Sequence, residues 1–205
     1  MIEAVTLDAF GTLLELRDPV PALREALHAR GVERAPAEVE AAFRAEADYY
    51  VPRSYEGRDE ESLARLRREC AAVFLRAAGT DIDPEEFVGS FMAALAFRAV
   101  PGAADAIREL RRRGLALAVV SNWDMSLPQR LREAGLDGFD AVVSSAEAGA
   151  QKPDPRPFAL ALARLGVAPA RALHVGDGEA DEEGARAAGM RFAHAPLADV
   201  VRRLA

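Results

Sequence analysis

Residues 4–13 read AVTLDAFGTL, a short apolar run that ends in a carboxylate and is followed by a glycine and a hydroxyl. The run from Ala4 to Leu7 is typical of a buried strand in a parallel sheet. Asp8 then stands at the carboxyl end of this strand, where open α/β sheets carry their functional groups. An Asp there can act as a covalent nucleophile, although an Asp that ends a strand is also a common turn residue. Gly11 permits a tight loop whose backbone N–H groups can face an anion, and Gly11 and Thr12 are candidate substrate-binding residues.

Three later segments repeat the pattern of an apolar run that ends in a polar residue, which predicts further parallel strands. They are Leu115 to Val120 before Ser121, Ala141 to Val143 before Ser144, and Ala172 to Val175 before Gly176 and Asp177. Helical patterns lie between them, at about Ser126 to Ala134 and Pro155 to Leu165. Strands and helices alternating at this length predict right-handed crossovers in one sheet, so the expected fold class is α/β with a Rossmann-like parallel sheet.

The chain from Asp18 to about Phe97 shows only helical patterns. They cover about Pro21 to Ala29, Ala37 to Tyr50, Glu60 to Ala78 and Pro84 to Ala96. An all-helical block inserted after the first strand predicts a cap domain over the carboxyl edge of the sheet. The alternative is that these helices pack on the faces of the sheet. We therefore expect a core formed by residues 1–16 and 97–205, and a helical cap formed by residues 17–96.

Composition excludes several classes of protein. Half of the 205 residues are apolar and 29% are charged, which is ordinary for a soluble globular protein, and no uncharged stretch is long enough to span a membrane. A net charge of -7 argues against a general nucleic-acid surface. The single cysteine, Cys70, cannot form an internal disulfide and is expected to be a buried thiol. The N-terminus enters a strand without a targeting segment, which favours a cytoplasmic location. The oligomeric state is left open.

Three later motifs support the first one. They read SNWD at residues 121–124, QKPDP at residues 151–155 and HVGDGEAD at residues 174–181. Together with AVTLDAFGTL they resemble, in order, the four motifs of the haloacid dehalogenase (HAD) superfamily. Residues 100–190 look most like the subfamily of HAD-domain-containing protein 3 and REG-2-like hydrolases. The resemblance implies a hydrolase in which Asp8 is a nucleophile that forms an aspartyl-phosphate. It also implies that Ser121, with the Asn122 backbone, binds a phosphoryl oxygen, and that Lys152 neutralises charge.

The resemblance further implies a Mg²⁺ ion held by the Asp8 carboxylate, the Phe10 backbone carbonyl and Asp177. A hard cation prefers such oxygen ligands, and it would offset the repulsion between a carboxylate and a phosphate ester. Two positions depart from the family pattern. Phe10 stands where these phosphatases usually carry an Asp that protonates the leaving group. The second acidic residue of the last motif is either Asp181 or Glu182, of which we favour Asp181 as support for the metal site and Lys152.

The predicted cap contributes an aromatic and basic cluster where a helix breaks. Arg53 and Tyr55 are its candidate substrate-binding residues, since guanidinium groups and aromatic faces suit an anionic ligand. The alternative is a helix-ending loop with solvated arginines. His174 is interpreted as a packing residue at a strand end, and Trp123 is expected to pack beside the loop at Ser121.

Three functions are compatible with these residues. The first is a Mg²⁺-dependent phosphatase of small phosphorylated metabolites. The second is a 2-haloacid dehalogenase, which Phe10 suits because halide leaves without a proton, whereas Asp177 argues against it because that branch of the superfamily needs no metal. The third is a catalytically weak ligand-binding or regulatory protein, against which the set of Asp8, Ser121, Lys152 and Asp177 argues.

Overall fold

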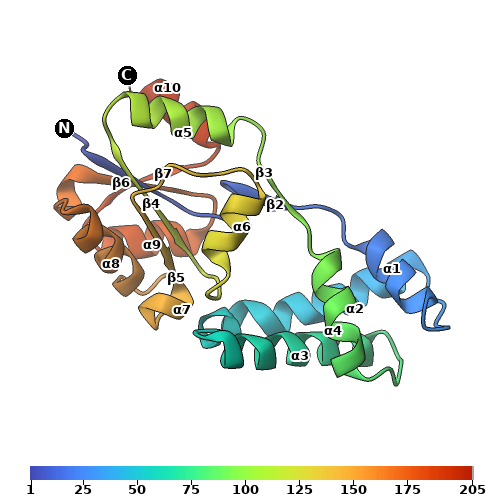
Figure 1. Cartoon of the computed structure of the whole chain (residues 1–205). Coiled ribbons are helices and arrows are strands. Elements are labelled where there is room, and N and C mark those ends of the chain that lie inside the picture. The colour runs from blue at the N-terminus through green and yellow to red at the C-terminus, as the bar shows by residue number, and fades with distance from the viewer. Residues whose placement is uncertain (205) are drawn as a thin grey trace. The chain divides into compact units, whose positions relative to one another are not determined.

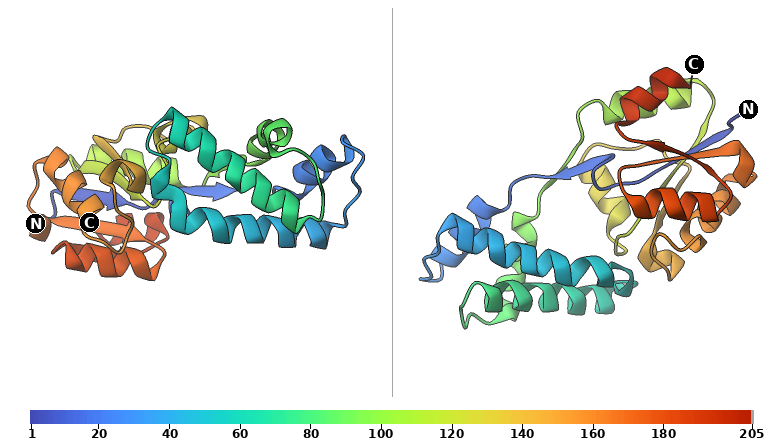
Figure 2. Two further views of the ribbon diagram at one scale, coloured as in Figure 1. Left: turned by 90° about the horizontal axis from the view of Figure 1, so that it is seen from below. Right: turned by 180° about the vertical axis from the view of Figure 1, so that it is seen from behind.

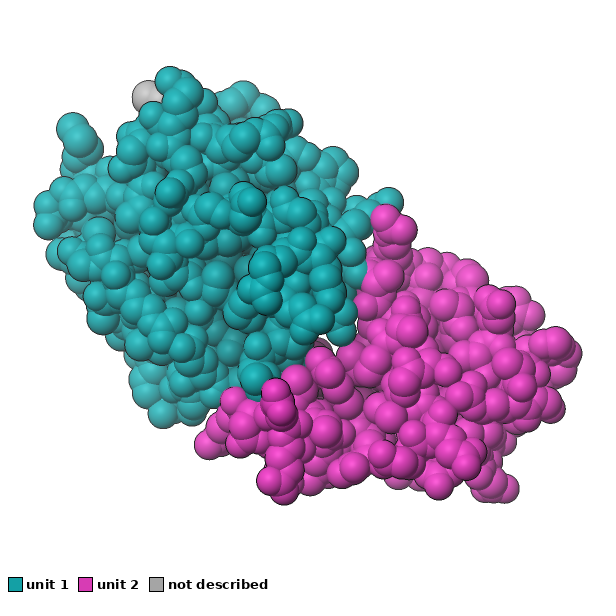
Figure 3. All heavy atoms as spheres, viewed as in Figure 1, with its two compact units in different colours: residues 1–15, 97–205 teal, residues 16–96 magenta. Residues whose placement is uncertain are grey.

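The computed structural model describes residues 1–204, which form two compact units (Figure 3). One unit comprises Met1–Glu15 and the chain from Phe97 onward, and it contains a parallel sheet flanked by helices. The other unit, Leu16–Ala96, is built of helices. The predicted fold class, a parallel sheet core with a helical insertion after the first strand, is confirmed.

The sheet of the first unit has five parallel strands in the order β5-β4-β1-β6-β7 (Figures 1 and 2). The strands are β1 (Ala4–Leu7), β4 (Ala116–Ser121), β5 (Ala141–Ser144), β6 (Ala172–Gly176) and β7 (Arg191–His194). The first four confirm the predicted strands within one residue at each end. β7 was not predicted, because it is short, partly exposed and carries charged and polar residues among its four positions.

Helices cover both faces of this sheet. The helical elements after Phe97 are α5 (Ala103–Arg112), α6 (Leu127–Glu133), α7 (Ser145–Ala148), α8 (Arg156–Leu165), η2 (Pro169–Arg171), α9 (Glu179–Ala187) and α10 (Leu197–Arg203). Alternate strand residues face opposite ways, as the pleat requires. Val5 and Leu7 therefore join one apolar cluster with α5, α6 and α10, while Ala4 joins a second cluster with α8 and α9. β1 is thus buried on both faces, which fixes the position of the residue that follows it.

The helical unit has its own apolar core. Its elements are α1 (Val20–His28), α2 (Pro36–Tyr50), η1 (Val51–Glu56), α3 (Glu60–Ala77) and α4 (Pro84–Ala94). The four α-helices confirm the predicted ones. Phe74 stacks on Phe87 and contacts Phe91 at ring-centroid distances of 5.8 and 5.5 Å, and Cys70 is buried as expected.

The segment at the end of the insertion differs from its prediction. Helical patterning was expected up to about Phe97, but α4 ends at Ala94 and Phe97–Ala99 forms β3, which pairs with β2 (Leu14–Leu16). A three-residue strand is too short to show a period of its own, so only its partner reveals it. Among the described residues, no helix has both the length and the apolar character needed to cross a membrane.

Candidate active site

Polar side chains gather at the carboxyl edge of the sheet. Asp8 follows β1, Ser121 ends β4 and Asp177 follows β6, and β1 lies between the other two strands. The Asp8 N–H donates to the Val175 carbonyl at 2.9 Å, which extends the ladder between β1 and β6 by one residue. Asp8 and Ser121 are buried, whereas Asp177 is exposed. The residues predicted at separate strand ends therefore share one edge.

The loop after Asp8 is shaped by Gly11. Its φ of +81° lies in the left-handed region, and an added Cβ would lie 2.1 Å from Asp177 Oδ2. Only glycine lets the Asp177 carboxylate approach this closely. The Gly11 N–H donates to the Leu14 carbonyl and the Thr12 N–H to the Ala9 carbonyl. These two N–H groups are therefore used within the loop, and the role of Gly11 and Thr12 in substrate binding remains a prediction.

Thr12 offers a different group. Its hydroxyl oxygen is buried and has no hydrogen-bond partner among residues 1–204. Buried polar groups nearly always find a partner, so an unpartnered hydroxyl in the loop after Asp8 suits a bound ligand.

Lys152 lies between two carboxylates. Its Nζ donates to Asp8 Oδ1 and to Asp181 Oδ1, each at 2.5 Å, and all three side chains are buried. Burial alone would lower the pKa of Lys152, but the charges of Asp8 and Asp181 outweigh it and raise this pKa above its ordinary value. Lys152 is also the only lysine in the sequence. Its ammonium group is held charged against the candidate nucleophile.

The Asn122 side chain fixes the backbone of Lys152. Asn122 Oδ1 accepts from the Lys152 N–H at 2.7 Å, and Asn122 Nδ2 donates to the Lys152 carbonyl at 3.1 Å. The sequence assigned Asn122 a role through its backbone alone, and this contact between distant parts of the chain was not foreseen. The signal in the sequence that could have indicated this contact is the amide side chain directly after Ser121.

The structure separates the two acidic candidates of the last motif. Asp181 contacts Lys152, whereas Glu182 pairs with Arg186 at 2.6 Å and approaches His194 at 3.6 Å. Asp181 fits because Gly176 lacks a side chain: a Cβ there would lie 2.4 Å from Asp181 Cγ. The geometry thus favours Asp181 as the partner of Lys152.

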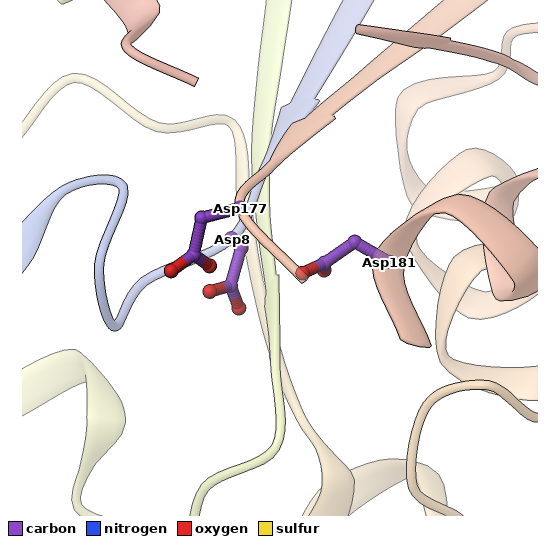
Figure 4. Close-up of side chains that lie close together, drawn as sticks. All are labelled: Asp8, Asp177 and Asp181. Carbon is purple, nitrogen blue, oxygen red and sulfur yellow. The ribbon is translucent and has the colours of Figure 1, made fainter. Parts of the chain in front are cut away.

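Three carboxylates form a cluster that could hold a metal ion (Figure 4). Each residue offers one carboxylate oxygen, and these three oxygens, from Asp8, Asp177 and Asp181, all lie within 4.8 Å of one another. Asp181 already accepts hydrogen bonds on both oxygens, from Lys152 and His174 on Oδ1 and from the Gly178 N–H on Oδ2. Burial, and then the charge of Asp8, raise the pKa of Asp177. This excess of negative charge fits a hard cation, with Asp8 and Asp177 as its carboxylate ligands.

The remaining predicted residues lie in different surroundings. The Phe10 side chain is 52% exposed, although it follows the candidate nucleophile by two residues. Trp123 is buried and packs edge-on against Phe97 at 5.0 Å, as expected. Arg53 and Tyr55 belong to the helical unit, where the Arg53 guanidinium stacks on the Tyr49 ring at 4.1 Å. Their role in substrate binding remains a prediction.

Comparison with known proteins identifies the family of the chain. The family model for haloacid dehalogenase-like hydrolases matches residues 2–189. The chain is 36% identical to human haloacid dehalogenase-like hydrolase domain-containing protein 3 over 92% of its own length and 80% of the relative. It is 48% identical to phosphoserine phosphatase from Thermus thermophilus, over only 44% of its own length and 38% of the relative.

Among solved structures, L-2-haloacid dehalogenase from Xanthobacter autotrophicus is similar, with a TM-score of 0.69 and 30% identity. The match covers 95% of this chain and 77% of that dehalogenase. Phosphatases and dehalogenases are thus both among its relatives. Because the family model matches most of the chain and the human relative is similar over 92% of it, the chain belongs to the haloacid dehalogenase-like hydrolases.

Proposed function

We propose that this hydrolase is a Mg²⁺-dependent phosphatase of small phosphorylated metabolites, with Asp8 as its nucleophile. The observation that carries the proposal is the exposed Asp177 carboxylate beside Asp8. Lys152 pairs with Asp8 and Asp181, while burial, followed by the charge of Asp8, raises the pKa of Asp177, so a cation beside Asp8 and Asp177 would be stabilised. Asp8, the Phe10 carbonyl and Asp177 would hold the ion. When bound, Mg²⁺ would polarise the phosphoryl oxygens and reduce their repulsion of Asp8.

Four residues of the chain would take part directly in the proposed reaction. An Asp8 oxygen attacks phosphorus, a bond forms between them, and the ester P–O bond breaks with its electron pair leaving on the alcohol oxygen. Water then attacks phosphorus, the bond to Asp8 breaks, and the Asp8 carboxylate and inorganic phosphate are released. Ser121 and Thr12 donate hydroxyl hydrogens to phosphoryl oxygens, and Lys152 offsets the charge shared by Asp8 and the phosphoryl group.

The helical unit, residues 17–96, is proposed to be a cap that completes the substrate site. Arg53 and Tyr55 would then contact the part of the substrate beyond its phosphate. A guanidinium group suits an anionic substrate, and its stacking on Tyr49 orders it beforehand.

Phe10 narrows the substrates of the proposed phosphatase. An alkoxide leaving group needs a proton that Phe10 cannot donate, whereas a phenolate or carboxylate departs with little protonation. Aryl and acyl phosphates should therefore be hydrolysed faster than alkyl phosphates, by roughly 100- to 10,000-fold.

A 2-haloacid dehalogenase is the second candidate. The exposed Phe10 and the similarity to a dehalogenase structure favour it. In that reaction Asp8 would displace halide from C2 of the substrate and form an ester, which water would then hydrolyse. The Asp177 carboxylate favours the phosphatase, because a halide displacement has no need of a metal ligand at this position.

One panel of substrates separates these functions. The purified protein would be assayed against p-nitrophenyl phosphate, alkyl phosphates of graded leaving-group pKa, acetyl phosphate and 2-chloropropionate, each with MgCl₂ or EDTA. We expect Mg²⁺-dependent phosphate release that falls as the leaving-group pKa rises. Mg²⁺-independent chloride release without phosphatase activity would assign a dehalogenase instead. No turnover of any substrate by a folded, Mg²⁺-binding protein would assign a ligand-binding role.

A further inference from the structure

A buried histidine is linked to the catalytic lysine by hydrogen bonds. His174 lies in the middle of β6 and is fully buried. Its Nδ1 lies 2.8 Å from the hydroxyl oxygen of Thr6, its register partner on β1, and its Nε2 lies 2.9 Å from Asp181 Oδ1. Since Asp181 Oδ1 also accepts from Lys152, an unbroken chain of side chains runs from Thr6 to Asp8.

The chemistry of the partners fixes the direction of each bond. Burial, the largest influence, lowers the pKa of His174, so the ring is neutral and has one N–H. Burial alone would raise the pKa of Asp181, but the hydrogen bond from His174 and the charge of Lys152 hold it at about 2. Asp181 is therefore an anion that needs donors, and His174 donates from Nε2. Nδ1 must then accept, and the Thr6 hydroxyl donates to it, which selects one tautomer.

Two aromatic rings pack against His174. The Phe158 ring lies edge-on at a centroid distance of 4.9 Å, and the Phe192 ring lies at 6.2 Å. An apolar side chain would fill this space without the cost of burying two polar nitrogens, a cost that only their two hydrogen bonds offset. The interpretation of His174 as a packing residue is therefore incomplete: it packs, and it also holds Asp181.

We propose that His174, oriented by Thr6, is a positioning residue for Lys152. It keeps Asp181 Oδ1 at the point where Lys152 Nζ can contact Asp181 and Asp8 together. Without this donor the Asp181 side chain could rotate, and the Lys152 ammonium group would lose its fixed place against the nucleophile. The inference rests on the proposed function for its effect on turnover, but the position of Lys152 can be measured without any substrate.

Two substitutions of His174 separate positioning from packing. Glutamine places its amide nitrogen near the Nε2 position and can still donate to Asp181, whereas asparagine reaches only the Nδ1 position. With p-nitrophenyl phosphate and MgCl₂, His174→Asn should lower kcat by about 10- to 100-fold, as changes in outer-shell partners typically do, with little change in KM. His174→Gln should recover most of this loss. The same change at exposed His28, as His28→Asn, is the control and should leave kcat unchanged.

Lys152 also gives a direct spectroscopic signal, because it is the only lysine in the chain. Labelling with ¹³C,¹⁵N-lysine yields one lysine side-chain spin system in the NMR spectrum. His174→Asn should shift or broaden the Cε and Nζ signals of Lys152, and His174→Gln should keep them close to those of the parent. Should His174→Asn not fold, Thr6→Val gives the same readout, with a loss in kcat of about threefold to tenfold that Thr6→Ser restores.

The outcomes separate the two claims. An active Asp8→Asn variant would overturn the proposed function, and the lysine spectra would still decide the role of His174. An inactive Asp8→Asn variant together with parent-like kcat and lysine signals in His174→Asn would overturn the positioning role alone. Equal losses in His174→Asn and His174→Gln would also overturn it, because they would show that the ring matters only for packing.

Discussion

Two buried carboxyl groups, one in each unit, are held in opposite protonation states. Asp181 lies in the sheet unit and Glu46 in the helical unit, and the two are about equally inaccessible to solvent. Burial alone would raise both pKa values. The pKa of Asp181 is nevertheless held at about 2, because His174 and Lys152 donate to it. Burial raises the pKa of Glu46 to about 7, and a hydrogen bond with Cys70 offsets this only in part.

The difference shows that partners, and not depth, decide the charge of a buried acid. In the sheet unit, the carboxylates of Asp8 and Asp181 and the ammonium group of Lys152 form a charged network at the candidate active site. In the helical unit, the same kind of side chain is a neutral packing group near pH 6. Four substitutions test this contrast, from the largest expected effect to the smallest.

Asp8→Asn should have the largest effect. The amide is nearly the same size but cannot attack phosphorus, so turnover should fall by at least about a thousandfold. Phosphate release from p-nitrophenyl phosphate with MgCl₂ measures this fall, and circular dichroism checks that the fold is intact. Retained activity in a folded variant would place the nucleophile at another residue.

Lys152→Met should cost the most stability. Removing the cation leaves the buried carboxylates of Asp8 and Asp181 facing each other, and breaking a buried ion pair in this way costs about 3–5 kcal/mol. Urea unfolding near neutral pH measures the free energy of unfolding. Lys152→Arg is the matched control: it keeps the charge, so it should lose less stability, although the planar guanidinium should not restore turnover. An unchanged stability in Lys152→Met would show that the network does not stabilise the fold.

Glu46→Gln should stabilise the protein at alkaline pH and have little effect at pH 4. The pKa of Glu46 is raised from 4.5 to about 7, so the folded state holds a proton that the unfolded state releases. The wild-type protein therefore loses stability as the pH rises from about 4.5 to about 7, by on the order of 3 kcal/mol. Urea unfolding of both proteins from pH 4 to pH 8 measures this difference. Parallel curves for the two proteins would contradict the raised pKa.

Asp177→Asn should have the smallest effect on the stability of the protein, but it should clearly weaken Mg²⁺ binding. Removing this proposed carboxylate ligand should weaken Mg²⁺ binding by about tenfold or more, which is typical of substitutions around a metal site. Without Mg²⁺, stability should not fall, because the substitution removes negative charge that Lys152 does not offset. Titration calorimetry compares the Mg²⁺ affinities, with Glu179→Gln, on the first turn of α9, as the control. Equal affinities in parent and Asp177→Asn would rule out this metal site.

Much of the fold follows from local patterns. The four predicted strands and the four helices of the insertion were confirmed, because a buried strand and an amphipathic helix each carry a period that adjacent residues reveal. β2, β3 and β7 were missed for the converse reason. They are only three or four residues long, and pairing makes them strands: β2 pairs with β3, and β7 pairs with β6.

The sequence by itself determined which residues meet at the carboxyl edge, since Asp8, Ser121 and Asp177 each end or follow an apolar run. Only the tertiary structure decided how they contact one another. Thr6 and His174 are 168 residues apart, and they touch because β1 lies beside β6 in one register. Lys152 bonds to both Asp8 and Asp181 because Gly176 leaves room for the second carboxylate. Strand order and side-chain clearance arise from packing among distant segments, and a local pattern carries no information about either.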